Sequence, residues 1–322
     1  MTGHAVPKVI ITFFVVAMIT VLVGYFFATG NVLSLNNLPI LVSLLLLVPL
    51  YVWEKNYAKT AELSKEVNRK NKSTVFFWIF ALFILALSIR IPSVLLVSGI
   101  PLEKTPVIYL TILTVLVVEK TDISAFGFKV KRIGKSLLYG MLFFLLLDGI
   151  GLAITYVLFY TFTGQTPVQT YDALPFLSTV AFMTFCVGIC EEGLFRGYMQ
   201  THLEKLYSPR KAIFIQAIFF GVWHFVWNLS PFDPFGMAQY VATTFFIGLF
   251  FGYFYSKTRN LVPLVFAHGL WDSVPQGIIA STVAADAFQT VALRNQILTL
   301  ALPYVISSIV TFFFIRKLVK KV

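Results

Sequence analysis

The amino-acid sequence predicts an all-α fold, a polytopic bundle of about ten membrane-spanning helices within a range of about 8–10. Hydrophobic residues make up 58% of the 322 residues and charged residues only 12%, whereas about a quarter of an ordinary soluble domain is charged. Apolar runs of about 20 residues, the length that crosses a bilayer, recur along the chain. Basic residues gather in alternate connections between these runs, which is typical of cytoplasmic loops.

The apolar runs define the expected spans in chain order. They lie at 9–29, 37–53, 74–100, 106–118, 137–162, 174–200, 211–229, 237–256, 261–280 and 296–315. The run at 106–118 is short, and the run at 74–100 contains Arg90 and Pro92, so we expect it to kink or to end early. The first run is too long for a signal peptide and is expected to be an anchor helix.

The distribution of basic residues predicts that both termini lie in the cytoplasm. Most of the 25 Lys and Arg residues fall in connections that this topology places inside, while Lys104 and Arg294 fall outside and Arg90 and Arg196 lie within spans. The net charge of +11 then reflects topology and gives no reason to expect nucleic acid. We therefore expect a multi-pass protein of the cell membrane, with the lipid bilayer as a partner.

Three charged residues lie inside the sixth run: Glu191, Glu192 and Arg196. Such residues cost about 2.5–3.5 kcal/mol each at a bilayer centre, so they usually face a polar cavity and have a function. Glu192 and Arg196 are four residues apart and share one helix face, which predicts an ion pair. Glu191 points about 100° away from Glu192. We expect Glu191 to be unpaired and available as a general base.

Two later runs each carry a histidine, His224 in the seventh and His268 in the ninth, and Asp272 lies one turn after His268. A lone histidine in a membrane helix is more often an interhelical hydrogen bond than a ligand. At about 1.5 Å per residue, however, both histidines fall in the same layer as Glu191, between the cytoplasmic end and the midplane. This shared depth predicts one site that opens to the cytoplasm.

The remaining polar groups are expected to be structural or solvated. Arg90 and Asp148 are intramembrane charges for which a structural role is favoured. Cys186 and Cys190 are one turn apart on one helix, where a disulfide is disfavoured and two thiols make no zinc site. His202 lies near the end of its run and is expected to be solvated. The aromatic residues near His224, Trp223 among them, are expected first as lipid or core contacts.

Two histidines and a glutamate match the ligand types of catalytic zinc, but no HExxH spacing places two ligands on one helix face. The cofactor therefore stays unknown, with a divalent metal such as zinc as one alternative. In the other alternative these groups activate water directly. Glu191 and His224 would take its proton, while His268 and Asp272 would stabilise an oxyanion.

At these residues the chain resembles the CPBP family of CAAX proteases and bacteriocin-processing enzymes, whose type II CAAX prenyl endopeptidases are the best-known branch. The family pattern is EExxxR on one membrane helix, FxxxH on the next, and HxxxN or HxxxD further on. The matching residues are Glu191, Glu192, Arg196, Phe220, His224, His268 and Asp272. Asp272 stands where the prenyl-protein branch characteristically has Asn.

The resemblance implies an intramembrane endopeptidase whose active site faces the cytoplasm. It assigns water activation to Glu191 and His224, and oxyanion binding to His268 with Asp272. Glu192 and Arg196 would have a supporting role. Family members have been described both as metalloproteases and as metal-independent glutamate proteases, so both alternatives for the cofactor stay open.

The expected domain organisation follows from the same resemblance. Residues 1–73 would form N-terminal membrane helices and a basic cytoplasmic loop, and residues 74–322 a membrane-embedded protease domain with its motif core at 174–277. The expected substrate is a membrane-associated protein or peptide, lipidated or not, processed in CAAX-type or bacteriocin-type reactions. Two other functions stay open: a transporter or channel with an intramembrane carboxylate and histidine relay, and a non-catalytic immunity scaffold.

Overall fold

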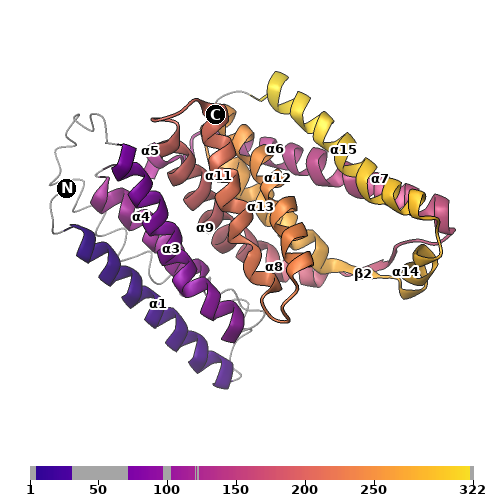
Figure 1. The fold of residues 1–322 in the computed structure, drawn as a ribbon, viewed down its shortest axis with the longest axis horizontal. Helices are drawn as coiled ribbons and strands as arrows, with labels where there is room; N and C mark the ends of the chain where they lie inside the picture. Colours follow the sequence, from indigo (N-terminus) through magenta and orange to yellow (C-terminus); the bar gives the residue numbers. More distant parts are fainter. Residues whose placement is uncertain (1–4, 31–71, 97–102, 120, 122, 320–322) are drawn as a thin grey trace. The chain divides into compact units, whose positions relative to one another are not determined.

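The computed structural model describes residues 5–30, 72–96, 103–119, 121 and 123–319. These residues form an all-α fold, apart from one two-stranded antiparallel ribbon (Figure 1). The chain divides into two compact units, each built from two stretches of sequence. The first unit comprises Met1–Lys129 and Phe185–Leu261, and the second comprises Val130–Thr184 and Val262–Val322.

The first unit contains the helices around the predicted glutamate pair. Its helices are α1 (Ala5–Gly30), α3 (Lys72–Leu96), α4 (Lys104–Leu113), α5 (Ile123–Phe126), α9 (Ile189–Glu192), α10 (Thr201–Leu203), α11 (Pro209–Trp223) and α12 (Pro234–Thr258), with π-helical turns η2 (Thr114–Val118) and η5 (Gly193–Gln200) and the 3₁₀ turn η6 (Phe225–Asn228). Helix α1 packs on α4, α4 on α9, and α11 on α12. The glutamate pair is thus surrounded by helices from distant parts of the sequence.

The second unit contains the helix of His268. Its elements are α6 (Ile133–Phe144), α7 (Ile150–Thr163), α8 (Ala173–Phe182), α13 (Val262–Ser273), α14 (Thr282–Gln289) and α15 (Leu293–Lys317), the strands β1 (Val168–Tyr171) and β2 (Ile278–Ala280), the π-helical turn η3 (Leu145–Gly149) and the 3₁₀ turn η7 (Val274–Gly277). The π-helical turn η4 (Met183–Gly188) belongs to this unit up to Thr184 and to the first unit from Phe185. Helix α13 packs between α6 and α8, and α7 packs on α15.

Five helical stretches of the described residues are long and apolar enough to cross a membrane. They are Lys72–Leu95, Ile133–Thr163, Ala173–Leu203, Pro234–Thr258 and Leu293–Lys317, and Pro7–Thr20 and Lys104–Val118 are shorter apolar helices. Each coincides with an expected span. The expected span at 37–53 lies outside the described residues.

The ends of three helices can be compared with the expected spans. The helix that contains Pro92 does not end there but continues to Leu96. The helix expected at 211–229 is too long, because α11 ends at Trp223 and a 3₁₀ turn follows. The span expected at 261–280 is also too long, because α13 ends at Ser273 and the chain continues into η7 and β2. Apolar composition alone did not reveal these two helix ends.

Local sequence explains several of the helix boundaries. The Asp233 carboxylate accepts hydrogen bonds from the backbone N–H groups of Phe235 and Gly236 at 3.1 and 3.0 Å, and Pro234 occupies the first turn of α12. Asp172 caps α8 in the same way. At the other end of α12, Arg259 adopts a left-handed conformation with φ of 51°, which terminates the helix.

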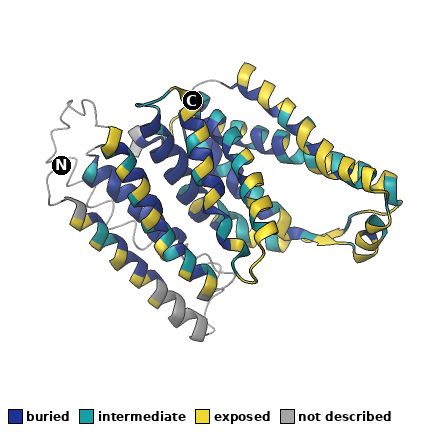
Figure 2. Cartoon of the chain, viewed as in Figure 1, coloured by how far each residue is buried: buried dark blue, intermediate teal, exposed yellow. Residues whose placement is uncertain are grey.

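Burial along α15 is typical of a membrane helix (Figure 2). Large apolar side chains such as Leu293 and Tyr304 are exposed, whereas Thr299, Pro303, Ser307 and Thr311, each four residues after the one before, are buried. Small polar residues allow close approach of membrane helices, and apolar residues face lipid. The second unit therefore presents an apolar exterior along this helix.

Candidate functional site

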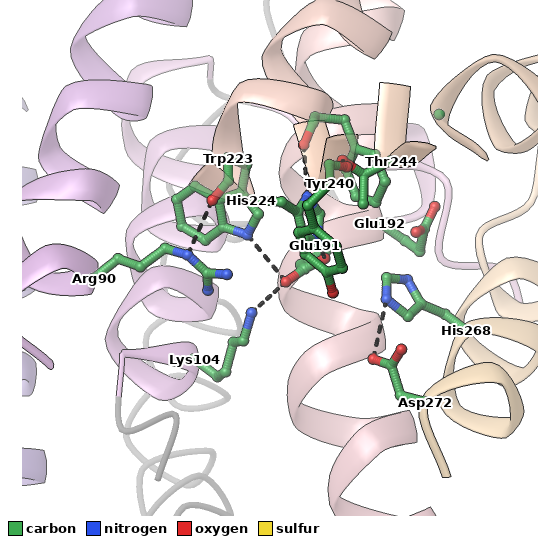
Figure 3. A network of polar contacts seen from close by, with 12 residues as sticks. Arg90, Lys104, Glu191, Glu192, Trp223, His224, Tyr240, Thr244, His268 and Asp272 are labelled. Atoms are coloured by element: carbon green, nitrogen blue, oxygen red, sulfur yellow. Dashed lines mark hydrogen bonds and ion pairs between the residues drawn. The ribbon is translucent and has the colours of Figure 1, made fainter. Parts of the chain in front are cut away.

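Glu191 is the centre of a buried polar network in the first unit (Figure 3). Its side chain is 3% exposed. The Oε1 atom accepts a hydrogen bond from the indole N–H of Trp223 at 3.0 Å and contacts the ammonium group of Lys104. The expectation that Glu191 is unpaired is therefore wrong. The helix carrying Glu191 places it against α4 and α11, and the sequence spacing within one helix could not reveal partners on other helices.

Lys104 begins helix α4 and is 2% exposed, so it is a buried helical residue and does not lie in a solvated loop. Its Nζ lies 3.7 Å from Oε1 of Glu103, in addition to its contact with Glu191. The Nη1 of Arg90 lies 2.6 Å from the same Glu103 oxygen, and the Arg90 Nε–H donates to the backbone carbonyl of Trp223 at 3.2 Å. Arg90 thus has the structural role expected for it.

We call Arg90, Glu103, Lys104 and Glu191 the charge quartet. The charges alternate along it, and two cations balance two carboxylates. Each member is nearly or fully excluded from solvent. An isolated charge in such a place is strongly destabilising, and pairing with further hydrogen bonds offsets this cost. The arrangement can therefore keep Glu191 as a carboxylate in an apolar surrounding.

His224, another predicted site residue, lies next to Glu191 in the first unit. Its Nδ1 lies 2.7 Å from the carbonyl oxygen of Phe220, so in the neutral ring this nitrogen carries the proton. The other nitrogen, Nε2, lies 3.6 Å from Oε2 of Glu191. His224 caps the end of α11 rather than lying within a long span. The ring therefore presents the Nε2 lone pair toward Oε2 of Glu191.

Glu192 and Arg196 form the predicted ion pair. Nη1 of Arg196 lies 3.0 Å from Oε1 of Glu192, and both side chains are fully buried. The Arg196 guanidinium also lies over the Phe220 ring, 4.1 Å from its centroid, and one of its N–H groups faces the carbonyl of Gly248 at 3.5 Å. The pair thus connects the η5 helix to α11 and α12, in agreement with a supporting role.

Helix geometry around the glutamates is irregular. The π-helical turns Met183–Gly188 and Gly193–Gln200 flank the short α-helical stretch Ile189–Glu192. Such turns are rare and occur frequently at functional sites. Cys186 and Cys190 lie in this region as buried cysteines, as expected.

The second unit holds the other predicted pair. Nε2 of His268 lies 3.4 Å from Oδ2 of Asp272, one helical turn later on α13. The Asp272 side chain is 32% exposed, whereas His268 is 7% exposed. The shared helix face predicted from the fourfold spacing is thus present, and Asp272 can orient the imidazole.

The side chains around Glu191 do not favour a metal ion. Among the described residues, no three His, Cys, Asp or Glu side chains are grouped so that they could hold one. The Lys104 ammonium lies at Oε1 of Glu191, and it would repel a divalent ion bound to the same carboxylate. The donor set thus fits an ion-paired carboxylate better than a metal ligand.

Sequence reasoning missed Lys104, Glu103 and Trp223 as neighbours of Glu191. One signal was available, because Lys104 was an exception to the cytoplasmic distribution of basic residues and lies directly before an apolar run. His202 was also misjudged. It is buried, and its Nε2 lies 3.1 Å from the Glu119 carboxylate, so it is not solvated.

The fold and these clusters define a helical membrane protein with buried carboxylate and histidine pairs. Residues 173–274 match the family model described as type II CAAX prenyl endopeptidase Rce1-like, in agreement with the CPBP resemblance. This stretch contains both glutamates and both histidines of the predicted site. Comparisons with curated proteins and with solved structures gave no match. The match covers 102 of the 322 residues, and this part of the chain is thus similar to a family of CAAX proteases.

Proposed function

We propose that this protein is an intramembrane endopeptidase that hydrolyses peptide bonds of membrane-associated substrates with water activated by Glu191 and His224. The observation that carries the proposal is the 3.6 Å separation of Glu191 Oε2 and His224 Nε2 inside a buried, charge-balanced network. Both atoms are hydrogen-bond acceptors when the imidazole is neutral. A water molecule beside both atoms can donate a hydrogen bond to either of them, and either group can then take its proton as a general base.

The reaction then follows from these groups. Glu191 or His224 takes a proton from the water molecule while the water oxygen bonds to the scissile carbonyl carbon. A tetrahedral oxyanion forms. When the C–N bond breaks, the same proton is returned to the leaving amine. His268, oriented by Asp272, donates to the oxyanion in this proposal, which follows the family pattern. Glu192 and Arg196 support the helix that carries Glu191.

Location and topology complete the proposal. The protein would be a multi-pass protein of the cell membrane with about ten spans, and both termini and the active site would face the cytoplasm. Residues 74–322 would form the protease domain, preceded by the N-terminal helices and basic loop of residues 1–73. The substrate would be a C-terminal CAAX-type tail or a processed peptide, with or without a lipid. The sequence match at 173–274 supports this class of substrate.

Cleavage of C-terminal peptides by purified protein tests the proposal. Prenylated and unprenylated peptides are compared, each with and without a chelator. Wild type should cleave, and Glu191→Ala and His224→Ala should each lower kcat/KM by about 10²–10⁴-fold, the usual contribution of a general base. Asp286→Ala, which removes an exposed carboxylate on α14, should cleave like wild type.

The outcomes separate the alternatives. Cleavage that survives Glu191→Ala would refute the proposal. Loss of cleavage with chelator and its recovery with zinc would instead assign a metal to the reaction. If no variant cleaves, proton-coupled flux in proteoliposomes that disappears in Glu191→Gln would favour the transporter. A cellular phenotype that is unchanged by substitution of both Glu191 and His224 would favour the immunity scaffold.

A further inference from the structure

We propose that Lys104 is a positioning residue for Glu191, which it holds as a carboxylate with one oxygen directed toward His224. This inference rests on the proposed function, because Glu191 is the group that it would prepare for catalysis. Lys104 lies outside the segment matched by the family model, which begins at residue 173. The contact therefore adds a residue to the site that neither the motif pattern nor the family match contains.

The geometry divides the two oxygens of Glu191 between two tasks. Oε1 receives the Trp223 indole N–H at 3.0 Å and contacts the Lys104 ammonium, while Oε2 faces His224. A carboxylate fixed through one oxygen keeps the other oxygen in a defined place. Lys104 therefore determines which Glu191 oxygen is presented to the imidazole and to a water molecule beside the two groups.

Lys104 is itself held from the opposite side. Glu103 lies 3.7 Å from its ammonium nitrogen, and Arg90 is paired with Glu103 at 2.6 Å. The Arg90 guanidinium also lies 4.2 Å from the centroid of the Trp223 ring, above the indole that donates to Glu191. Both donors to Glu191 are thus supported by the same arginine. The other members of the charge quartet thus hold the Glu191 carboxylate in a fixed position.

The charge of Lys104 is the feature to test. Gln at this position keeps an N–H donor on a side chain one bond shorter and carries no charge, whereas Arg keeps the charge with a different donor geometry. We expect Lys104→Gln to lower kcat by about 10²-fold, as a misplaced catalytic group does. Its KM should change by less than about threefold, because substrate contacts are not removed. Lys104→Arg should retain kcat within about tenfold of wild type.

Lys131→Gln is the matched control, since Lys131 is exposed and the substitution is chemically the same. It should match wild type. Three results would overturn the proposal: Lys104→Gln with wild-type kcat, a loss confined to KM, or a loss in Lys104→Arg as large as in Lys104→Gln. The last result would mean that shape and not charge matters at this position.

A thermal double-mutant cycle on the full chain in detergent tests the contact without any substrate. Lys104→Gln and Glu191→Gln each remove one charge of a buried pair, so each should lower the unfolding temperature. The double variant should lose less than the two single losses added together. Additive losses would overturn the proposal. Wild type that cleaves no peptide would refute the proposed function, while a non-additive cycle would still establish that Lys104 holds Glu191.

Discussion

The Glu192–Arg196 pair allows a quantitative test of the supporting role. Both side chains are fully buried, and Nη1 of Arg196 lies 3.0 Å from Oε1 of Glu192. Arg196→Met removes the cation, keeps much of the side-chain volume and leaves a carboxylate in an apolar surrounding. Removing one partner of a buried ion pair costs about 3–5 kcal/mol. We therefore expect Arg196→Met to destabilise the protein by that amount.

The loss converts into a measurable temperature shift. The unfolding entropy is about 2.1 cal/mol/K per residue, so the unfolding entropy of a chain of 322 residues is about 0.7 kcal/mol/K. A loss of 3–5 kcal/mol then lowers the unfolding temperature by about 4–7 °C. The measurement is thermal unfolding in detergent. Arg294→Met, the same change at an exposed position of α15, serves as the control and should shift it by less than about 1 °C.

The double variant Glu192→Gln/Arg196→Met sharpens this prediction. Because it removes both charges together, it should recover most of the lost stability. Peptide cleavage by Arg196→Met, measured well below its unfolding temperature, should stay within about tenfold of wild type, because Arg196 touches no reacting atom in the proposed mechanism. An unfolding temperature equal to wild type, or a double variant as unstable as the sum of the single ones, would refute the reasoning.

Two further predictions concern neighbours of the site. Trp223→Phe removes the hydrogen bond to Glu191, which at about 1.5–3 kcal/mol for a charged acceptor predicts a fall in kcat of about 10–150-fold. Trp78→Phe, at a buried indole whose N–H has no hydrogen-bond partner among the described residues, should retain wild-type cleavage, and equal activity of both variants would contradict the assignment. Gly221→Ala places a Cβ 2.8 Å from the Val241 carbonyl oxygen and should lower the unfolding temperature by about 1.5–4.5 °C, the effect of about 1–3 kcal/mol of overpacking. Gly134→Ala, where the space is open, should not lower it, and equal shifts would exclude close packing of α11 on α12 as the cause.

The parts of the site that could be predicted from the sequence are those fixed within one helix. The pairing of Glu192 with Arg196 and the shared face of His268 and Asp272 follow from a spacing of four residues, and both contacts are present. The helical class and the positions of most helices follow in the same way from apolar runs of bilayer length. Sequence spacing therefore predicted the helices and the contacts within a single helix.

The ends of α11 and α13 were not predicted from hydropathy, because an apolar run can continue after the helix has ended. Residues after Trp223 and after Ser273 remain apolar, so hydropathy continues while the backbone changes to 3₁₀ turns. An apolar segment buried in protein need not be helical at membrane depth, since neighbouring groups can satisfy its backbone. His224 thus lies at a helix end, where its ring can meet Glu191 on a different helix.

The partners of Glu191 were missed because they depend on which helices pack together. Within its own helix Glu191 has no cation at a spacing of three or four, which made it look unpaired. Lys104 precedes it by 87 residues and Trp223 follows it by 32. A charge balance would have been the better guide, because a buried carboxylate in an apolar protein requires a cation. Lys104 was one of the two basic residues that the topology placed outside, and it is the one next to an apolar run. An exception to the positive-inside pattern next to an apolar run is therefore a reason to look for a buried ion pair.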